Sequence, residues 1–357
     1  MTLKQQAILT ITLLALATCV AGQTSDDRYP VVIDGKVGFI DYKGREIIPA
    51  KFGNAGDSAH FFEGLAPVSG PGGSGYIDIS GNFVVGPRKE WIVNHPFHEG
   101  IAALLLVGES GQENTPAWID SRGKVLFSGS RMGERYFSDG LAPLLFGKKW
   151  GFVDRQFHIV IEPQFEWADE FSEGLAVVRP GNKWGFIDKS GKLVIAAKYD
   201  LAWPFRDGLG RVRMDIPDGT VMTEEGPRTR YKYKYGFVDH EGNEVIPLQF
   251  EEATFFSGGY ALVCPQNSAL FGIIDKAGKL VHPPQYEHAS DFHEAVSAVA
   301  VNGKWGYVDT SGSWVIPAEF EHADDFWHGL ARVVWPDGYG GYIDKSGQVV
   351  WKSARRR

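Results

Sequence analysis

Short apolar runs separated by turn-forming residues dominate the chain beyond its first twenty residues. The runs are rich in β-branched and aromatic residues, the breaks are rich in Gly, Asn, Ser and Pro, and no later segment sustains the period of a helix. The clearest stretch has apolar runs at 174–178, 184–188 and 192–195, with turn residues between them. Each such unit is therefore predicted to form three antiparallel strands.

A four-residue core marks each unit and gives the number of units. It consists of a small residue, an apolar residue, Ile or Val, and Asp, as in Gly185 to Asp188, and it occurs nine times. The nine aspartates are Asp41, Asp78, Asp120, Asp154, Asp188, Asp239, Asp275, Asp309 and Asp344. The basic period is about 34 residues, with insertions in some units, which is typical of a tandem repeat array.

The repeated Asp is predicted to open a tight turn. In eight units a Gly follows it three residues later, as Gly191 follows Asp188, whereas Phe157 takes this place after Asp154. Asp accepts backbone N–H groups at the start of a turn, and Gly adopts the positive φ that closes it. A row of calcium ligands is the competing interpretation, but it requires several carboxylates that converge within a unit, and the spacing does not supply them.

A second repeated position, three residues before the first strand of a unit, holds Phe. We expect this residue to pack between neighbouring units, because a unit of this size cannot bury its own apolar face. Its occurrences are Phe61, Phe97, Phe137, Phe171, Phe205, Phe256, Phe292 and Phe326.

The repeated segments resemble the WG repeat, also called the KWG repeat, of bacterial proteins. The resemblance rests on the runs Lys149–Asp154, Lys183–Asp188 and Lys304–Asp309, and on the flanking Phe171–Ala176 segment, and it extends over 29–351. It implies a repeat array, often in exported proteins, without established catalytic residues.

The predicted fold is all-β, a tandem array of about nine three-stranded WG-type repeats. An open, solenoid-like or superhelical array is favoured, because the chain begins with a first strand and ends with a third, so no terminal strand is left to complete the first unit. A closed β-propeller is the alternative, since radial closure also protects sheet edges.

The N-terminus has the composition of a secretory signal. Lys4 is followed by an apolar stretch from Ala7 to Ala21, which is shorter than the roughly 20 residues of a membrane-spanning helix. We expect residues 1–21 to be a signal peptide, 22–351 the repeat array and 352–357 a basic tail exposed to solvent. Two alternatives are lipid attachment at Cys19, which lies in a sequence similar to a lipoprotein box, and retention as an uncleaved anchor. No later segment is apolar enough to span a membrane.

The net charge and the candidate reactive residues limit the functions that the sequence supports. A formal net charge of −8 disfavours binding to nucleic acid or anionic lipid. Cleavage would leave Cys264 as the one cysteine, so no intramolecular disulfide is expected. Zinc could be bound by His288 and His322 together with the acidic residues near them. However, these histidines occupy the position that Trp167 holds in another link, which indicates surface residues. We assign no catalytic residue, metal ligand or cofactor.

The favoured function is a non-catalytic binding or scaffolding surface in the cell envelope, with an unknown protein or glycan as partner. The alternatives are a glycan- or cell-wall-binding module and, less favoured, a hydrolase. The interval from Asp188 to Asp239 is the longest between repeated aspartates, and the inserted segment 215–234 is polar. It is either a tolerated surface loop or a protruding hairpin that contacts an acidic partner or glycan. The candidate contact residues are Arg228, Arg230, Tyr231, Lys232, Tyr233 and Lys234.

The signal-peptide interpretation predicts the N-terminus of the exported protein. Sequencing of that protein should begin at or near Gly22, because Ala21 suits the cleavage site. A lipidated Cys19 would select the lipoprotein alternative, and an intact Met1 in the cytoplasm would contradict export altogether.

Overall fold

The computed structural model describes residues 27–53, 59–93, 95–108, 113–129, 135–223 and 226–356. The expected signal peptide and Cys19 lie outside these residues. The described part is all-β, and every paired strand is antiparallel to its neighbour, as the alternating pattern predicted.

Nine units follow one another, each built around three consecutive strands. Units one to three contain β1 (Tyr29–Ile33), β2 (Lys36–Ile40), β3 (Glu46–Phe52), β4 (Ala66–Gly70), β5 (Gly73–Ile77), β6 (Phe83–Arg88), β7 (Trp91–Ile92), β8 (Ile101–Leu106), β9 (Thr115–Asp120) and β10 (Val125–Ser128). Units four to six contain β11 (Leu141–Phe146), β12 (Lys149–Asp154), β13 (Ile159–Phe165), β14 (Trp167–Ser172), β15 (Leu175–Arg179), β16 (Trp184–Ile187), β17 (Leu193–Tyr199), β18 (Leu201–Arg206), β19 (Leu209–Thr223), β20 (Gly226–Val238) and β21 (Glu244–Ala253). Units seven to nine contain β22 (Tyr260–Pro265), β23 (Phe271–Asp275), β24 (Leu280–Tyr286), β25 (His288–Ala289), β26 (Val296–Val301), β27 (Lys304–Asp309), β28 (Trp314–Phe320), β29 (His322–Ala323), β30 (Leu330–Val334), β31 (Tyr339–Asp344) and β32 (Val349–Arg356).

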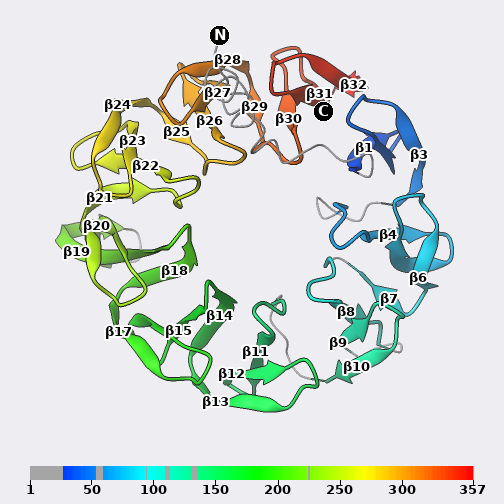
Figure 1. The fold of residues 1–357 in the computed structure, drawn as a ribbon, viewed down its shortest axis with the longest axis horizontal. Helices are drawn as coiled ribbons and strands as arrows, with labels where there is room; N and C mark the ends of the chain where they lie inside the picture. Colours follow the sequence, from blue (N-terminus) through cyan, green and yellow to red (C-terminus); the bar gives the residue numbers. More distant parts are fainter. Residues whose placement is uncertain are drawn as a thin grey trace, which may run out of the picture.

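The units are arranged around a ring. The first strand of a unit, such as β4, β8 or β11, lies toward the centre, and the third, such as β6, β10 or β13, lies at the outside (Figure 1). The sixth and seventh units share one sheet, from β18 to β24, and the other units each have their own. The predicted tandem array of small antiparallel sheets is therefore confirmed.

The segment that links one unit to the next adds a further strand in most units, which the three-stranded prediction did not include. We call this segment, between a third strand and the following first strand, the link. The N–H of Glu166 donates to the carbonyl of Arg179 at 2.8 Å, and the N–H of Glu287 donates to that of Ala300 at 2.8 Å. The link thereby covers the inner edge of the unit's first strand, whose backbone groups would otherwise lack a partner.

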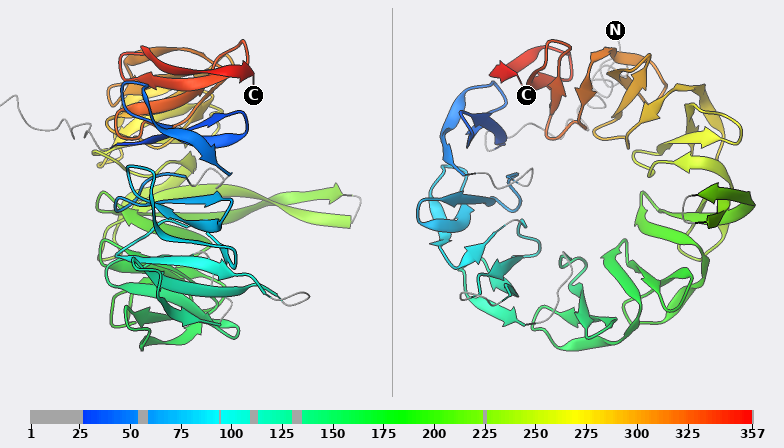
Figure 2. Two further views of the ribbon diagram at one scale, coloured as in Figure 1. Left: turned by 90° about the vertical axis from the view of Figure 1, so that its right-hand side faces the viewer. Right: turned by 180° about the vertical axis from the view of Figure 1, so that it is seen from behind.

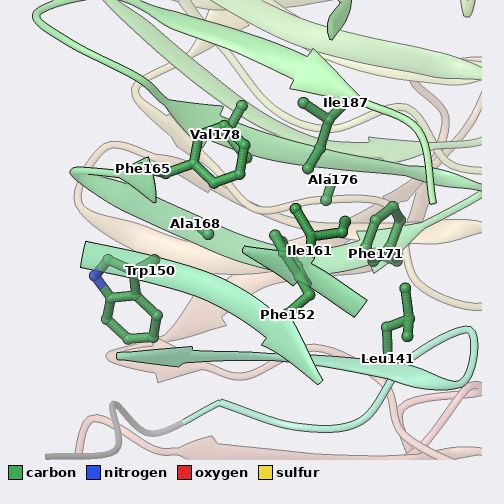
Figure 3. Close-up of a cluster of buried hydrophobic side chains, with 10 residues drawn as sticks. All are labelled: Leu141, Trp150, Phe152, Ile161, Phe165, Ala168, Phe171, Ala176, Val178 and Ile187. Carbon is green, nitrogen blue, oxygen red and sulfur yellow. The ribbon is translucent and has the colours of Figure 1, made fainter. Parts of the chain in front are cut away.

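The core of the protein lies between units rather than within them. Figure 3 shows one cluster, in which Phe152 and Ile161 of the fourth unit face Phe171 of the next link and Ala176 of the fifth unit. The rings of Phe152 and Phe171 are 5.0 Å apart, and those of Tyr307 and Phe326 are 4.7 Å apart. The repeated Phe therefore packs on the core aromatic of the preceding unit, as predicted from the sequence.

The predicted Asp turns are also confirmed. Oδ1 of Asp188 accepts the N–H groups of Ser190 at 2.9 Å and Lys192 at 3.1 Å, and Gly191 has a φ of 84°. The same two acceptor bonds occur at every repeated Asp. A Cβ at Gly191 would come within 2.9 Å of the Ile161 side chain, so Gly also allows close approach to the preceding unit.

The one turn without Gly keeps the same shape at a conformational cost. Phe157 adopts a φ of 63°, a region that costs an L-residue roughly 1–2 kcal/mol. Its ring stacks on Phe127 of the preceding unit, with centroids 5.0 Å apart and planes at 8°. Phe157 and Phe127 occupy the places that Gly191 and Ile161 hold in the following pair of units. The stacking of the two rings offsets the conformational cost.

A chain of carboxylates, which the sequence analysis did not predict, joins the turns that precede the first strands. The carboxylate of Glu63 accepts the N–H groups of Glu99 at 2.7 Å and Gly100 at 2.9 Å in the next unit. Glu99 in turn accepts the N–H of Gly140 at 3.1 Å, and Glu173 accepts that of Gly208 at 2.9 Å. The signal in the sequence is the acidic residue before Gly that recurs in most links.

The two ends of the array meet through side chains. The rings of Tyr29 and Tyr342 are 5.8 Å apart, the Tyr342 hydroxyl donates to the carbonyl of Pro30 at 2.9 Å, and the Tyr29 hydroxyl donates to that of His328 at 2.5 Å. In the described residues no sheet joins the first unit to the last, as expected from the absence of a spare terminal strand. The sheets thus stay separate, as expected for the open array. The two ends of the array nevertheless lie side by side, as expected for a radial arrangement (Figure 2).

The last strand extends beyond the boundary expected after Trp351. Tyr339 pairs with Arg356 and Gly341 with Lys352, so residues 352–356 belong to β32 rather than to a separate tail. An ion pair supports this extension, since the Lys352 ammonium lies 2.9 Å from the Asp337 carboxylate.

The turn hydrogen bonds predict a small, pH-dependent loss of stability in Asp188→Ala. The free energy of unfolding should fall by about 1 kcal/mol at neutral pH, because the bonds to Asp188 are lost. Hydrogen bonds from Ser190 and Lys192 hold the pKa of Asp188 below its usual 3.8. This stabilisation should therefore be complete above that pH and disappear as the pH falls below it.

Denaturant unfolding of both proteins between pH 2.5 and 7 measures the effect. Asp188→Asn, which retains an acceptor oxygen, serves as the control. A calcium-dependent rise in melting temperature that vanishes in Asp188→Ala would show that the carboxylate is a metal ligand and not a turn residue.

Candidate functional site

The inserted segment of the sixth unit forms a two-stranded ribbon that leaves the ring. Strands β19 and β20 pair from Gly210 with Val238 to Thr223 with Gly226, with one irregularity after Pro217. Strand β18 pairs with β19 only as far as Arg213, and β21 pairs with β20 only as far as Tyr235. Residues 214–223 and 226–234, which we call the ribbon, therefore project beyond the ring, as Figure 2 shows.

All six candidate contact residues lie on β20 and alternate between the two faces of the ribbon. Side chains of successive residues in a strand point to opposite faces. Arg228, Arg230, Lys232 and Lys234 therefore share one face, and Tyr231 and Tyr233 share the other. The two tyrosines are 46% and 44% exposed, so the structure brings these groups to the surface together.

Asp218 of β19 neutralises part of the basic face. The Asp218 carboxylate lies 3.0 Å from the Arg230 guanidinium and 3.3 Å from the Lys232 ammonium. These groups are mostly exposed, so each pair stabilises the ribbon by well under about 1 kcal/mol. The pairs hold the bases in position but leave them accessible to a competing anion.

The base of the ribbon is rigid because arginines and aromatic rings alternate there. The Arg213 guanidinium lies over the Tyr233 ring at 4.3 Å and pairs with Asp215 at 2.7 Å. Trp203 stacks on Tyr235 at 5.5 Å and carries Arg211 on its face at 4.3 Å. Burial lowers the pKa of Arg211 to about 10, which leaves it protonated at neutral pH.

Sequence reasoning did not identify Trp203, Arg211 or Arg213 as supports of the ribbon. They lie outside the insertion, at positions that are occupied in the other units too, so no break in the period marks them. The only indication of their role was the register in which β19 pairs with β20. That register follows from extending the two strands of the repeat in step.

The histidines considered as zinc ligands are exposed side chains that lie beside an aromatic ring. His288 stacks beside Trp305 at 6.1 Å, and His322 lies 6.2 Å from the same ring. Among the described residues, no group of three or more His, Cys, Asp or Glu side chains is placed to hold a metal ion. Over that same part of the chain, no helix has the length and apolar character needed to cross a membrane.

Solved structures with a similar course of the chain have little sequence in common with it. BamB from Moraxella catarrhalis is 8% identical, with 94% of this chain and 89% of that chain covered and a TM-score of 0.37. Sqt1 from Saccharomyces cerevisiae is 10% identical, with 69% and 80% covered and a TM-score of 0.41. The Pan2 WD40 domain from Neurospora crassa is 12% identical, with 73% and 87% covered and a TM-score of 0.34. At these values nothing about the function of this chain follows from them.

The family is shown by the repeats themselves. No curated protein matches the chain. The family described as "WG containing repeat" matches it six times, at residues 38–69, 150–184, 184–215, 235–267, 271–305 and 305–334. These segments cover more than half of the sequence, and each runs from the second strand of one unit to the first strand of the next. The chain therefore belongs to the family of proteins that contain WG repeats.

Proposed function

We propose that this protein is exported and acts without catalysis as a binding or scaffolding surface in the cell envelope, with the ribbon as its contact element. The observation that carries the proposal is the projection of the ribbon beyond the ring (Figure 2). Repeat arrays commonly bind through insertions on one face. Export rests on the composition of residues 1–21.

The ribbon contributes little to the core, which supports a role other than stability. The ribbon exposes three apolar side chains, those of Ile216, Val221 and Met222, which are 39%, 40% and 78% exposed. Side chains exposed to this degree add little to the stability of the ribbon. Solvent-exposed apolar and aromatic side chains beside bases are typical of contact surfaces. The ribbon therefore has the features expected of a contact element.

The charge of the ribbon points to an acidic partner. Its basic residues are concentrated on β20, in a protein whose net charge is −8. A local basic surface on an acidic protein favours encounter with acidic groups and sets the orientation of binding. An acidic envelope protein is the favoured partner, and an acidic glycan that stacks on Tyr231 is the second candidate.

Shortening the ribbon separates its role in binding from its role in folding. Replacement of residues 215–233 by an Asn-Gly turn, which keeps the pairing of Met214 with Lys234, should change the free energy of unfolding by less than about 1 kcal/mol, because loop length affects stability weakly. The same variant should lose capture of its partner from envelope extracts. A shortened protein that captures its partner as well as the wild type would contradict the proposal.

Two substitution pairs distinguish the candidate partners. Arg230→Glu with Lys232→Glu should abolish binding to an acidic protein, whereas Tyr231→Ala with Tyr233→Ala should abolish binding to purified peptidoglycan. The control is Arg122→Glu with Lys124→Glu, because these two bases are exposed in a turn of the third unit. Loss of binding in the control variant as well would show that net charge alone is responsible.

A further inference from the structure

The first unit differs from most others because no described strand pairs with the inner edge of its first strand. Val31 pairs with Gly38 as Val178 pairs with Gly185, so Val32 occupies the place of Arg179. In the fifth unit a link donates an N–H to the Arg179 carbonyl, but within the described residues β1 is the terminal strand of its sheet. Val32 is 52% exposed.

A cavity of about 700 Å³ lies beside that edge, between the two ends of the array. The last unit contributes Trp327 and Leu330 to its wall, the first unit Tyr29 and Val32, and the link before the second unit His60 and Phe62. Its volume is within the range of ligand sites, and its walls are mainly apolar and aromatic. We call it the seam cavity.

The seam cavity lies in the place where the other units hold a link. In those units the link supplies a Phe that packs on the preceding core aromatic, but here Tyr29, from β1 itself, packs on Tyr342. Tyr29 thus takes the place of the link's Phe, while no described residue takes the place of the link's strand. Phe62 and Trp327 come within 5.6 Å of each other, so the ninth unit touches the second unit's link directly.

The wall of the cavity contains two carboxylates and one guanidinium, that of Arg332. Asp324 and Asp325 line the cavity; Asp324 pairs with Arg332 at 2.7 Å, and Asp325 lies 3.3 Å from the ring of His293. Burial, followed by the charges of Asp27 and Glu294, raises the pKa of Tyr29, whose ring is buried in the wall of the cavity. A cationic group is therefore favoured as the charged part of an occupant.

We propose that the seam cavity binds an extended peptide segment of a partner protein that carries an aromatic side chain and at least one Lys or Arg. The segment adds a strand to the inner edge of β1, its aromatic ring packs between Trp327 and Phe62, and its cation faces Asp325. The chain's own residues 22–28 lack an aromatic residue, so they do not match this chemistry. The proposed site is separate from the ribbon and does not depend on it.

The test uses a fluorescent nonapeptide in which the acids and the Gln of the link 164–172 are replaced by Lys: Lys-Phe-Lys-Trp-Ala-Lys-Lys-Phe-Ser. Fluorescence anisotropy with the purified protein should show saturable binding. A peptide whose three aromatic residues are Ala should bind at least about tenfold more weakly, and the unaltered acidic link sequence should also bind more weakly. No binding of the cationic aromatic peptide, or equal binding of all three, would overturn the proposal.

Substitutions place the peptide in the cavity. Val32→Trp should fill the cavity and abolish binding, and Asp325→Asn should weaken it by about tenfold. The matched control is Val84→Trp, because Val84 is also 52% exposed and lies on β6, away from the cavity. Circular dichroism verifies that each variant is folded, and ribbon-shortened protein should bind the peptide normally.

Two further results would contradict the site. Binding that survives Val32→Trp would place the peptide elsewhere on the protein. Light scattering that shows dimers, dissociated by the peptide and absent in Val32→Trp, would assign the cavity to a second copy of this chain instead of a foreign partner.

Discussion

The fold depends on one contact, the packing of each repeated Phe on the core apolar residue of the preceding unit, which is aromatic in every unit except the seventh, where it is Ile273. A repeat unit of this size cannot bury its own apolar face, so each unit is stable only when its neighbour covers it. Burial of one such ring contributes roughly 2–3 kcal/mol. Because Phe171 and its equivalents recur in each link, this contribution is repeated along the array, and at the seam Tyr29 takes over the same role.

The repeated features could be predicted from the sequence because each has a local cause. The Asp turns follow from Asp and Gly at fixed separation, and the Phe contact follows from an apolar residue that recurs outside the strands. The link strands could not be predicted in this way, since their short segments, such as Trp167 to Ser172, form strands only because the neighbouring β15 offers free carbonyls. The same holds for the chain of carboxylates, in which Glu63 and Gly100 are brought together by the stacking of units.

The candidate site was predicted only in part for a similar reason. The insertion and its bases were visible as a break in the period, and the structure places them on a projecting ribbon. Its support by Trp203, Arg211 and Arg213 depends on the register between strands, and the seam cavity depends on where the ring brings its ends. Both sites lie where the repeat is interrupted, since regular units use their apolar residues to cover one another.

The most direct test of this account is a double-mutant cycle on Tyr29 and Tyr342, measured as free energies of unfolding. If the ends of the array pack by the same contact as its interior, Tyr29→Ala and Tyr342→Ala should show a coupling of about 1 kcal/mol, as aromatic pairs do. A parallel cycle on Phe152 and Phe171 calibrates the value for an interior pair. If the interior pair is coupled but the effects of Tyr29→Ala and Tyr342→Ala add within a few tenths of a kcal/mol, the contact does not continue across the ends, and the account of the ring is contradicted.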